Sequence, residues 1–282
     1  MKLIDGKKIA NELCAKLKVD IDKASVRSPG LAFVLVGEDP ASKIYVDMKT
    51  KKCQEMGIYS KTVKLPKNTL EKVVIKEIER LNHNPHIDGI LVQQPLPTDF
   101  STSHIVESID PNKDVDGFHP INMGKLLLGE DEGFVPCTPL GIVKLLEKCS
   151  AQVEGKHVVI VGRSNIVGKP LAALLVQKAK HCNATVTIAH SGTRNLAEIC
   201  KSGDILIVAI GNPLFINDHM VKRGAIIIDV GVNRIDRGIV GDVDVESVKE
   251  VASQITPVPG GVGPMTIAML LSNTYKSFQR RS

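Results

Sequence analysis

The sequence predicts an α/β protein with two domains, each built on a mainly parallel sheet. Segments rich in β-branched residues alternate with segments of helical periodicity along most of the chain, which is typical of such sheets. Residues 156–170 show one unit most clearly, because an apolar run ends in a glycine turn that opens a helical apolar period. The 282 residues are 43% hydrophobic but only 3% aromatic, so small aliphatic side chains must fill the cores of both domains.

The first domain is expected over residues 1–139. Apolar residues recur every four positions from Ile9 to Ile21, which predicts an amphipathic helix. Asp39 suits a helix start and Gly57 a helix end, while Pro95 ends the alternation just after a strand, where open α/β sheets place ligands. The expected elements are helices over 5–24, 43–56 and 70–82 and strands over 31–36, 61–65 and 89–93.

The second domain is expected over residues 140–264. Residues 110–122 are rich in Pro, Asp and Gly and predict a loop, and a helix over 140–149 bridges the domains. Residues 257–264 predict a rigid loop of prolines and glycines, before a helix over 265–278. The C-terminal segment 265–282 is expected to pack on the first domain. Strands are expected over 157–161, 185–189, 205–210, 225–230 and 255–258, with a polar turn at 236–238.

The glycine turn is a candidate nucleotide site. Gly162 permits a sharp turn, and Gly168 lets the next helix lie close to the sheet. Backbone N–H groups at that helix start would face an anion, as in pyrophosphate binding. The spacing is Gly-x5-Gly rather than Gly-x-Gly-x-x-Gly, so an ordinary turn between strand and helix stays an alternative.

The end of the next strand favours NADP over NAD. A nucleotide fold places its ribose-reading residue there, and this chain has His190 and Ser191, with Arg163 beside the first glycine and no carboxylate. A carboxylate would repel a 2′-phosphate, whereas hydroxyl and guanidinium groups bind one. Either Arg163 or Ser191 alone could be a solvated loop residue, but their combination indicates a phosphate site.

Composition argues against several classes of protein. The net charge is +5, but the basic residues are scattered, so no nucleic acid partner is predicted and small anionic molecules are favoured. The six cysteines lie far apart, which indicates reduced thiols, and neither they nor the eight histidines show metal-ligand spacing. We see no signal peptide and no apolar run of about 18 residues, so a cytoplasmic protein with no membrane contact and no metal is expected.

Tyr45 and Lys49 are four residues apart on one predicted helix, so their side chains share a face. The ammonium and phenol could relay protons or hold a planar ring, although a solvated basic helix face with one packed tyrosine is the common explanation of this pattern. Tyr-x-x-x-Lys also occurs in short-chain dehydrogenases. There it follows the glycine-rich turn, whereas here it precedes that turn by more than a hundred residues, which rejects that class.

Further polar residues stand at strand ends and loops. Gln93 ends a predicted buried strand, where its amide can donate and accept hydrogen bonds or simply face solvent. Asp114 and Asp116 alternate, so both would face one side of an extended loop, although such acids usually serve turns. We find no Gly-x-Ser-x-Gly or Cys/His signature for a covalent nucleophile.

Five segments, found in order through nearly the whole chain, carry a resemblance to a known family. They are Ser42-x-x-Tyr45-Val46-x-x-Lys49-x-Lys51, Gly89-Ile90-Leu91-Val92-Gln93-x-Pro95-Leu96-Pro97, Lys113-Asp114-Val115-Asp116-Gly117-Phe118, Gly162-Arg163-Ser164-x-Ile166-Val167-Gly168-x-Pro170 and Thr256-Pro257-Val258-Pro259-Gly260-Gly261-Val262-Gly263-Pro264-Met265-Thr266. These segments closely resemble segments of the bifunctional methylenetetrahydrofolate dehydrogenase/cyclohydrolase family, and the last segment is very specific.

The resemblance implies that NADP removes a hydride from 5,10-methylenetetrahydrofolate, and that water converts the methenyl cation to 10-formyltetrahydrofolate. It implies a folate-binding first domain, a Rossmann-like NADP domain, one cleft between them and a homodimer formed through the nucleotide domain. Lys49 would be the general acid/base with Gln93 bonded to it, Tyr45 would stack on the folate, and Asp116 would bind the pterin edge. The implied cofactor contacts are Gly162, Arg163, Ser164, Gly168, Ser191 and Val232, and the implied wall of the cleft is Pro259, Gly260 and Gly261.

The chain departs from the family pattern in small ways. Gln94 stands where leucine is more usual, and the Ser191 loop reads Ser-Gly-Thr-Arg-Asn, which leaves the preference for NADP open to test. Two alternatives stay open. Another two-domain NADP dehydrogenase, similar to shikimate dehydrogenase, would lack the Gln93 and Pro-Gly-Gly-Val-Gly-Pro segments, and a folate- or nucleotide-binding regulator would have lost catalysis.

Overall fold

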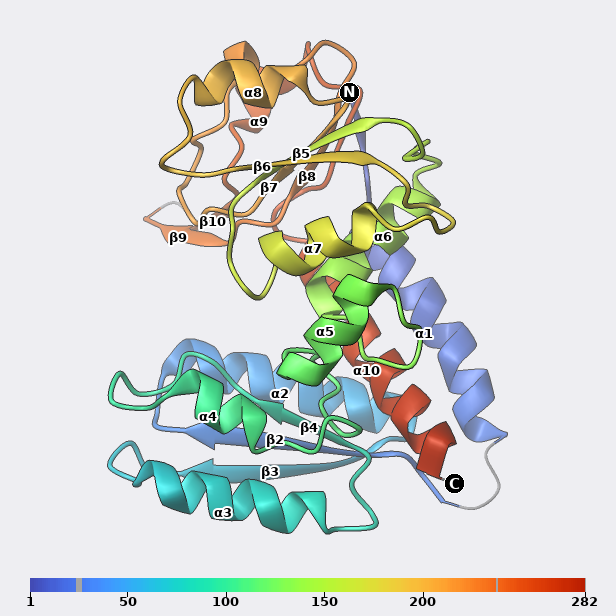
Figure 1. The fold of residues 1–282 in the computed structure, drawn as a ribbon, viewed down its shortest axis with the longest axis vertical. Coiled ribbons are helices and arrows are strands. Elements are labelled where there is room, and N and C mark those ends of the chain that lie inside the picture. The colour runs from blue at the N-terminus through green and yellow to red at the C-terminus, as the bar shows by residue number, and fades with distance from the viewer. Residues whose placement is uncertain (24–26, 237, 282) are drawn as a thin grey trace. The chain divides into compact units, whose positions relative to one another are not determined.

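The computed structural model describes residues 1–23, 27–236 and 238–281 and confirms the expected α/β class with parallel sheets (Figure 1). Three predicted elements include a residue outside the described ones. These are the helix over 5–24 (residue 24), the turn at 236–238 (residue 237) and the C-terminal segment 265–282 (residue 282). The chain forms two compact units, each considered by itself. The three-stranded unit comprises Leu13–Val135 and Leu270–Ser282, and the six-stranded unit comprises Met1–Glu12 and Pro136–Met269.

The three-stranded unit is built around β2 (Gly30–Val36), which is buried along its whole length. It pairs in parallel with β3 (Tyr59–Leu65) and with β4 (Gly89–Val92). The even-numbered side chains of β2 pack with Val74, Ile78 and Leu81 of α3 (Glu71–Asn82). Figure 1 shows α3 and α2 (Pro40–Met56) on opposite sides of this sheet, which explains why a continuous apolar strand is needed between them.

Two short helices of this unit were not predicted. α4 (Thr102–Glu107) is too short for a readable period, and the Ser101 side chain caps it. α5 (Pro120–Leu128) begins inside the expected loop over 110–122, so that prediction was wrong for its last residues. His119 accepts a hydrogen bond from the Ile121 backbone N–H at 3.1 Å, and Pro120 takes the first helical position, which together start the helix.

The six-stranded unit has the strand order β1-β11-β8-β7-β5-β6, with every pair parallel. Its core is almost entirely aliphatic, in agreement with the low aromatic content. Figure 1 shows α8 (Leu196–Ser202) and α7 (Gly168–Leu175) on opposite faces of the sheet. The strands are β1 (Lys2–Leu3), β5 (His157–Val161), β6 (Thr185–Ala189), β7 (Ile205–Val208), β8 (Ile226–Asp229) and β11 (Gln254–Ile255).

Other elements differ from the prediction mainly at their ends. β1 is only two residues long and was not predicted, and neither was the hairpin that surrounds the expected polar turn. α2 begins at Pro40 and the last helix at Val262, each three residues earlier than expected. In the part of the chain that the structure describes, no helix combines the length and apolar character needed to cross a membrane. The remaining elements are α1 (Gly6–Asp22), α6 (Cys137–Lys148), η1 (Asp218–Met220), β9 (Asn233–Ile235), β10 (Gly238–Val240), α9 (Val245–Val248) and α10 (Val262–Arg281).

Candidate active site

Each sheet has a switch point, where successive strands are added on opposite sides of one strand. β2 has β3 on one side and β4 on the other, and β5 has β6 on one side and β7 on the other. Open α/β sheets bind ligands at such points, outside the carboxyl ends of the strands. Gln93 directly follows β4 and Gly162 directly follows β5, so predicted site residues occupy both switch points.

Helix α2 positions Tyr45 and Lys49. Asp39 accepts a hydrogen bond from the Ser42 backbone N–H at 2.7 Å at its start, and Gly57 ends it in the left-handed region at φ 72°. The Tyr45 side chain is 44% exposed, and Lys49, one turn later, is half-buried. An exposed ring beside an amine offers a stacking surface and a proton carrier to a planar ligand.

The Lys49 ammonium donates a hydrogen bond to Gln93 Oε1 at 3.0 Å. The Gln93 amide is itself held, because its Nε2 donates to the Gln94 carbonyl at 2.6 Å and its backbone N–H donates to the Val34 carbonyl at 2.9 Å. The lysine nitrogen therefore has a fixed neighbour at the end of β4. A neutral amide orients the amine without the negative charge that would favour the protonated form.

The segment that carries Asp116 is a turn held by two buried charges. Asp114 Oδ2 accepts hydrogen bonds from the His119 backbone N–H at 2.8 Å and from Asn122 Nδ2 at 2.9 Å. Burial raises the pKa of Asp114, although these donors oppose the rise. The Lys113 ammonium donates to the carbonyls of Leu81, Asn82 and Asn84 at the end of α3, and burial, with the Arg281 charge, lowers its pKa to about 8.

This turn corrects one expectation. Asp114 and Asp116 do not form a pair on one side of an extended loop, because the backbone turns at these residues and Gly117 has φ 79°. Asp114 is 1% exposed, whereas Asp116 is half-buried. Asp114 therefore organises the turn, and Asp116 is the acid that a ligand can reach.

The glycine turn after β5 depends on close backbone contacts. Gly162 has φ 129°, and a Cβ there would lie 2.3 Å from the carbonyl oxygen of Ala209, which follows β7. A Cβ on Gly168 would lie 2.1 Å from the carbonyl oxygen of Gly162. Ser164 Oγ accepts a hydrogen bond from the Val167 backbone N–H at 3.1 Å. Only glycine fits both positions, so α7 can start directly against the turn.

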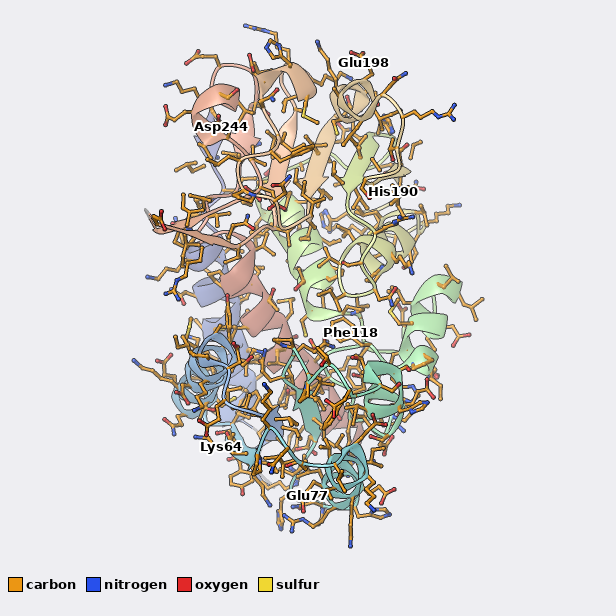
Figure 2. The ribbon with its side chains drawn as sticks, turned by 90° about the vertical axis from the view of Figure 1, so that its left-hand side faces the viewer. Lys64, Glu77, Phe118, His190, Glu198 and Asp244 are labelled. Atoms are coloured by element: carbon orange, nitrogen blue, oxygen red, sulfur yellow. The ribbon has the colours of Figure 1, made fainter. Side chains whose placement is uncertain are left out.

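His190 and Arg163 meet at the end of β6. Arg163 Nη1 lies 3.5 Å from His190 Nε2, and His190 Nδ1 accepts a hydrogen bond from the Gly192 backbone N–H at 3.1 Å. In the neutral tautomer the proton is then on Nε2, beside the guanidinium. Two donors side by side suit an anion. Figure 2 shows His190 where the chain leaves β6, and Ser191 beside it is exposed.

The remaining predicted residues lie on two loops of the six-stranded unit. Val232 follows β8, and its side chain is 54% exposed. Gly260 has φ 106° and its carbonyl accepts a hydrogen bond from the Lys7 backbone N–H at 2.9 Å, while Pro259 is exposed. A Cβ on Gly6 would lie 1.9 Å from the Gly261 carbonyl oxygen, so this loop lies tightly against the start of α1.

The structure thus brings Lys49 to Gln93 in one unit and Arg163 to His190 in the other. Sequence reasoning gave His190 no definite role, and its proximity to Arg163 required the paired ends of β5 and β6. It also missed two buried aspartates, Asp229 and Asp242, whose signal was only their position at the end of a strand or beside a glycine. Among the described residues, no group of three or more His, Cys, Asp or Glu side chains could hold a metal ion.

This combination defines a class: a nicotinamide-nucleotide dehydrogenase with a separate, lysine-bearing catalytic unit. Sequence models narrow the class. Residues 4–116 match the catalytic domain, and residues 136–282 the NAD(P)-binding domain, of tetrahydrofolate dehydrogenase/cyclohydrolase. The chain belongs to the tetrahydrofolate dehydrogenase/cyclohydrolase family.

Individual relatives agree over the whole length. The bifunctional protein FolD of Halalkalibacterium halodurans is 53% identical over 277 residues, which cover 98% of both chains. The bifunctional FolD enzyme of Campylobacter jejuni has a solved structure that is 47% identical, covers all of both chains and gives a TM-score of 0.96. The Trypanosoma brucei enzyme, solved with NADP and an inhibitor, is 35% identical over 99% of this chain and 97% of its own, with a TM-score of 0.92.

These findings confirm the expected family, the expected fold and the expected enzyme. The chain is a bifunctional methylenetetrahydrofolate dehydrogenase/cyclohydrolase with an NAD(P)-binding domain. The family match also removes the shikimate-dehydrogenase-like alternative.

The contact between Gly168 and Gly162 can be tested directly. We expect Gly168→Ala to destabilise the protein by about 1–3 kcal/mol, because the new methyl group overlaps a backbone oxygen that cannot move away freely. The free energy of unfolding is measured by urea titration followed by far-ultraviolet circular dichroism. Gly124→Ala is the matched control, since a Cβ there meets nothing within 4 Å. Equal stability of the two variants would contradict the close contact.

Proposed function

We propose that the lysine-bearing unit holds the folate at its switch point and that the six-stranded unit holds NADP at its own switch point. The observation that carries this proposal is the Lys49–Gln93 hydrogen bond of 3.0 Å at the end of β4. The functional division follows the predicted boundaries, with residues 1–139 serving the folate and residues 140–264 serving NADP.

Lys49 acts as the general acid/base of the hydrolytic step. Water that adds to the methenyl cation must lose a proton, and a neutral amine next to the carbon can take it and later return it to the departing ring nitrogen. Gln93 orients that amine through Oε1 without adding a charge. Tyr45 stacks on the folate and Asp116 accepts hydrogen bonds from the amino-pyrimidine edge, which fixes the reacting carbon near Lys49.

The residues of the six-stranded unit fit NADP. The Gly162–Gly168 turn lets α7 start directly against the end of β5, because a Cβ at either glycine would overlap backbone atoms. The backbone N–H groups at that helix start suit a pyrophosphate. Arg163, His190 and Ser191 offer donors to the 2′-phosphate, and Val232 with the loop over 259–261 borders the nicotinamide. When bound, NADP supplies the acceptor for the hydride. The protein contributes orientation and keeps water from the transfer.

We place the enzyme in the cytoplasm. None of the six cysteines forms a disulfide in the structure, and burial raises the pKa of the most exposed, Cys149. Six cysteines outside disulfides fit a reducing compartment.

The role of Lys49 is tested by Lys49→Met. We expect methenyltetrahydrofolate hydrolysis to fall by roughly 100-fold or more, the usual contribution of general acid–base catalysis, while NADP binding is retained. Methenyl absorbance is followed over time, and NADP binding by calorimetry. Lys43→Met, at a lysine of the same helix that pairs with Glu38 and whose side chain is 43% exposed, is the control and should keep full activity. Undiminished hydrolysis by Lys49→Met would remove the lysine from the mechanism.

The role of Arg163 is tested by Arg163→Ala. Loss of charge-assisted hydrogen bonds to the 2′-phosphate should raise the KM for NADP roughly 10- to 100-fold and leave the KM for NAD unchanged. Arg223→Ala, an exposed arginine of the same unit, should change neither constant. A wild-type enzyme that uses NAD as well as NADP would contradict the 2′-phosphate site.

The partner of this chain is a second copy of itself, paired through β6. This strand is at the edge of the six-stranded sheet, so the backbone groups of Val186 and Ile188 that point away from β5 face no strand among the described residues. The Ile188 side chain is 38% exposed, and Val176 at the end of α7 is 54% exposed. An edge strand rich in β-branched residues readily pairs with another chain.

Ile188→Lys tests this pairing. A buried charge at the centre of the strand contact should convert a dimer, of twice 30.5 kDa, to a monomer of 30.5 kDa in sedimentation equilibrium. Leu127→Lys, at a side chain 71% exposed on α5, should leave the mass unchanged. A wild-type monomer, or an Ile188→Lys dimer, would exclude β6 as the interface.

A further inference from the structure

Two buried carboxylates lie behind the proposed cofactor loop and play no part in the steps described above. Asp229 ends β8 and is 2% exposed, and Asp242 follows β10 and is 0% exposed. Among the described residues, no lysine, arginine or histidine forms an ion pair with either carboxylate. Burying two such charges is costly unless each is well hydrogen-bonded, so their contacts need an explanation.

Both carboxylates bind backbone N–H groups of separate loops. Asp229 Oδ1 accepts from the backbone N–H groups of Gly231 at 3.1 Å and Asp242 at 3.0 Å, and Oδ2 accepts from Val243 at 3.0 Å. Asp242 Oδ2 accepts from Ile210 at 2.8 Å and Gly211 at 3.0 Å. The loops after β7, β8 and β10 are therefore tied together by two side chains.

The same two side chains connect the proposed cofactor contacts. Asp242 Oδ1 accepts from Asn233 Nδ2 at 2.8 Å, directly after Val232, and a Cβ on Gly231 would lie 2.2 Å from the Asp242 carboxylate. The other end of the connection is the loop after β7, whose Ala209 carbonyl lies against Gly162. The position of Val232 relative to the glycine turn thus depends on these carboxylates.

We propose that Asp229 and Asp242 are positioning residues for NADP. They hold the loop that contains Val232 at a fixed position relative to the glycine turn at Gly162. The inference rests on the proposed contact between Val232 and the cofactor. Neither carboxylate reaches the ligand. Each acts through backbone N–H groups, so losing one should weaken cofactor binding and leave the hydrolytic step of the lysine-bearing unit intact.

The ionisation of Asp229 gives this arrangement a pH dependence. Burial raises the pKa of Asp229 to about 6, the Asp242 charge adds to the rise, and the three N–H donors oppose it. Asp242 is the titratable group of the surrounding loops whose charge acts on Asp229. At a pH below about 6 the protonated carboxyl group of Asp229 has an O–H donor that faces the backbone N–H donors. One hydrogen bond to a loop is then lost, and NADP binding weakens.

Protonation of Asp229 has the opposite effect on the stability of the folded protein. The pKa of Asp229 in the folded protein, about 6, exceeds the value of about 3.9 for an unfolded chain, so protonation between these values favours the folded state. Acid should therefore weaken cofactor binding through this residue without destabilising the fold through it.

The test measures both activities of Asp229→Asn in the full-length enzyme. The KM for NADP should rise roughly tenfold or more, because an amide N–H faces a backbone N–H, while methenyl hydrolysis stays within about twofold of wild type. Asp244→Asn is the matched control from the same segment (Figure 2), since an asparagine still caps α9. Unchanged NADP kinetics in Asp229→Asn, or an equal loss of both activities, would overturn the proposal.

A pH series provides the second readout. The KM for NADP of the wild type should rise as the pH falls through about 6, and Asp229→Asn should lack part of that rise. The 2′-phosphate, with a second pKa near 6, titrates in both proteins, so the difference between them isolates Asp229. Superimposable profiles would contradict the role of its ionisation.

Two further variants make the result unambiguous. If Asp229→Asn does not fold, Asn233→Ala is the replacement test. This variant removes the hydrogen bond from Asn233, next to Val232, to Asp242, and it should raise the KM for NADP several-fold with hydrolysis unchanged. Unchanged NADP kinetics would reject the proposal.

Val232→Glu tests the underlying cofactor contact. If Val232→Glu leaves NADP kinetics unchanged, the proposed contact is wrong, whereas an effect there with none in Asp229→Asn defeats the positioning role alone.

Discussion

The loops that follow parallel strands buried on both faces share one constraint: their backbone N–H groups need hydrogen-bond acceptors. These loops turn inside the protein, where water does not supply the acceptors. Buried aspartates meet this need three times: Asp114 in the turn beside β4, and Asp229 and Asp242 after β8 and β10. Because ligands bind at these same ends, the residues that stabilise the loops also determine where the ligand-facing residues lie.

The two parallel sheets place different groups at their switch points. At Lys49 the hydrogen-bond acceptor is a neutral amide, which suits the acid–base role that we propose for the amine. Around Arg163 the neighbour is an imidazole that presents a second donor, which suits a permanently charged ligand group. In the proposed function, acid–base chemistry and anion binding therefore belong to different sheets.

The sequence predicted those helices and strands whose apolar pattern is long or repeated. The β-branched runs identified β5 and β6 to the residue, and the four-residue spacing placed Tyr45 and Lys49 on one helix face. What could not be predicted depends on pairing between distant segments. β1 has two residues and exists only because β11 lies beside it, and Asp114 is buried because Asn122 and His119 fold back onto it. The roles of Asp229 and Asp242 could not be predicted for the same reason, since no local period marks a carboxylate that accepts hydrogen bonds from distant loops.

The pairing of β1 with β11 also bears on how the six-stranded sheet is assembled. Lys2 lies opposite Gln254 and Leu3 opposite Ile255, so β1 has no partner until β11 has been synthesised, about 250 residues later. The central strands β5, β6 and β7 can associate earlier, since they are close in sequence. β1 therefore adds to the edge of a sheet whose central strands can already have paired.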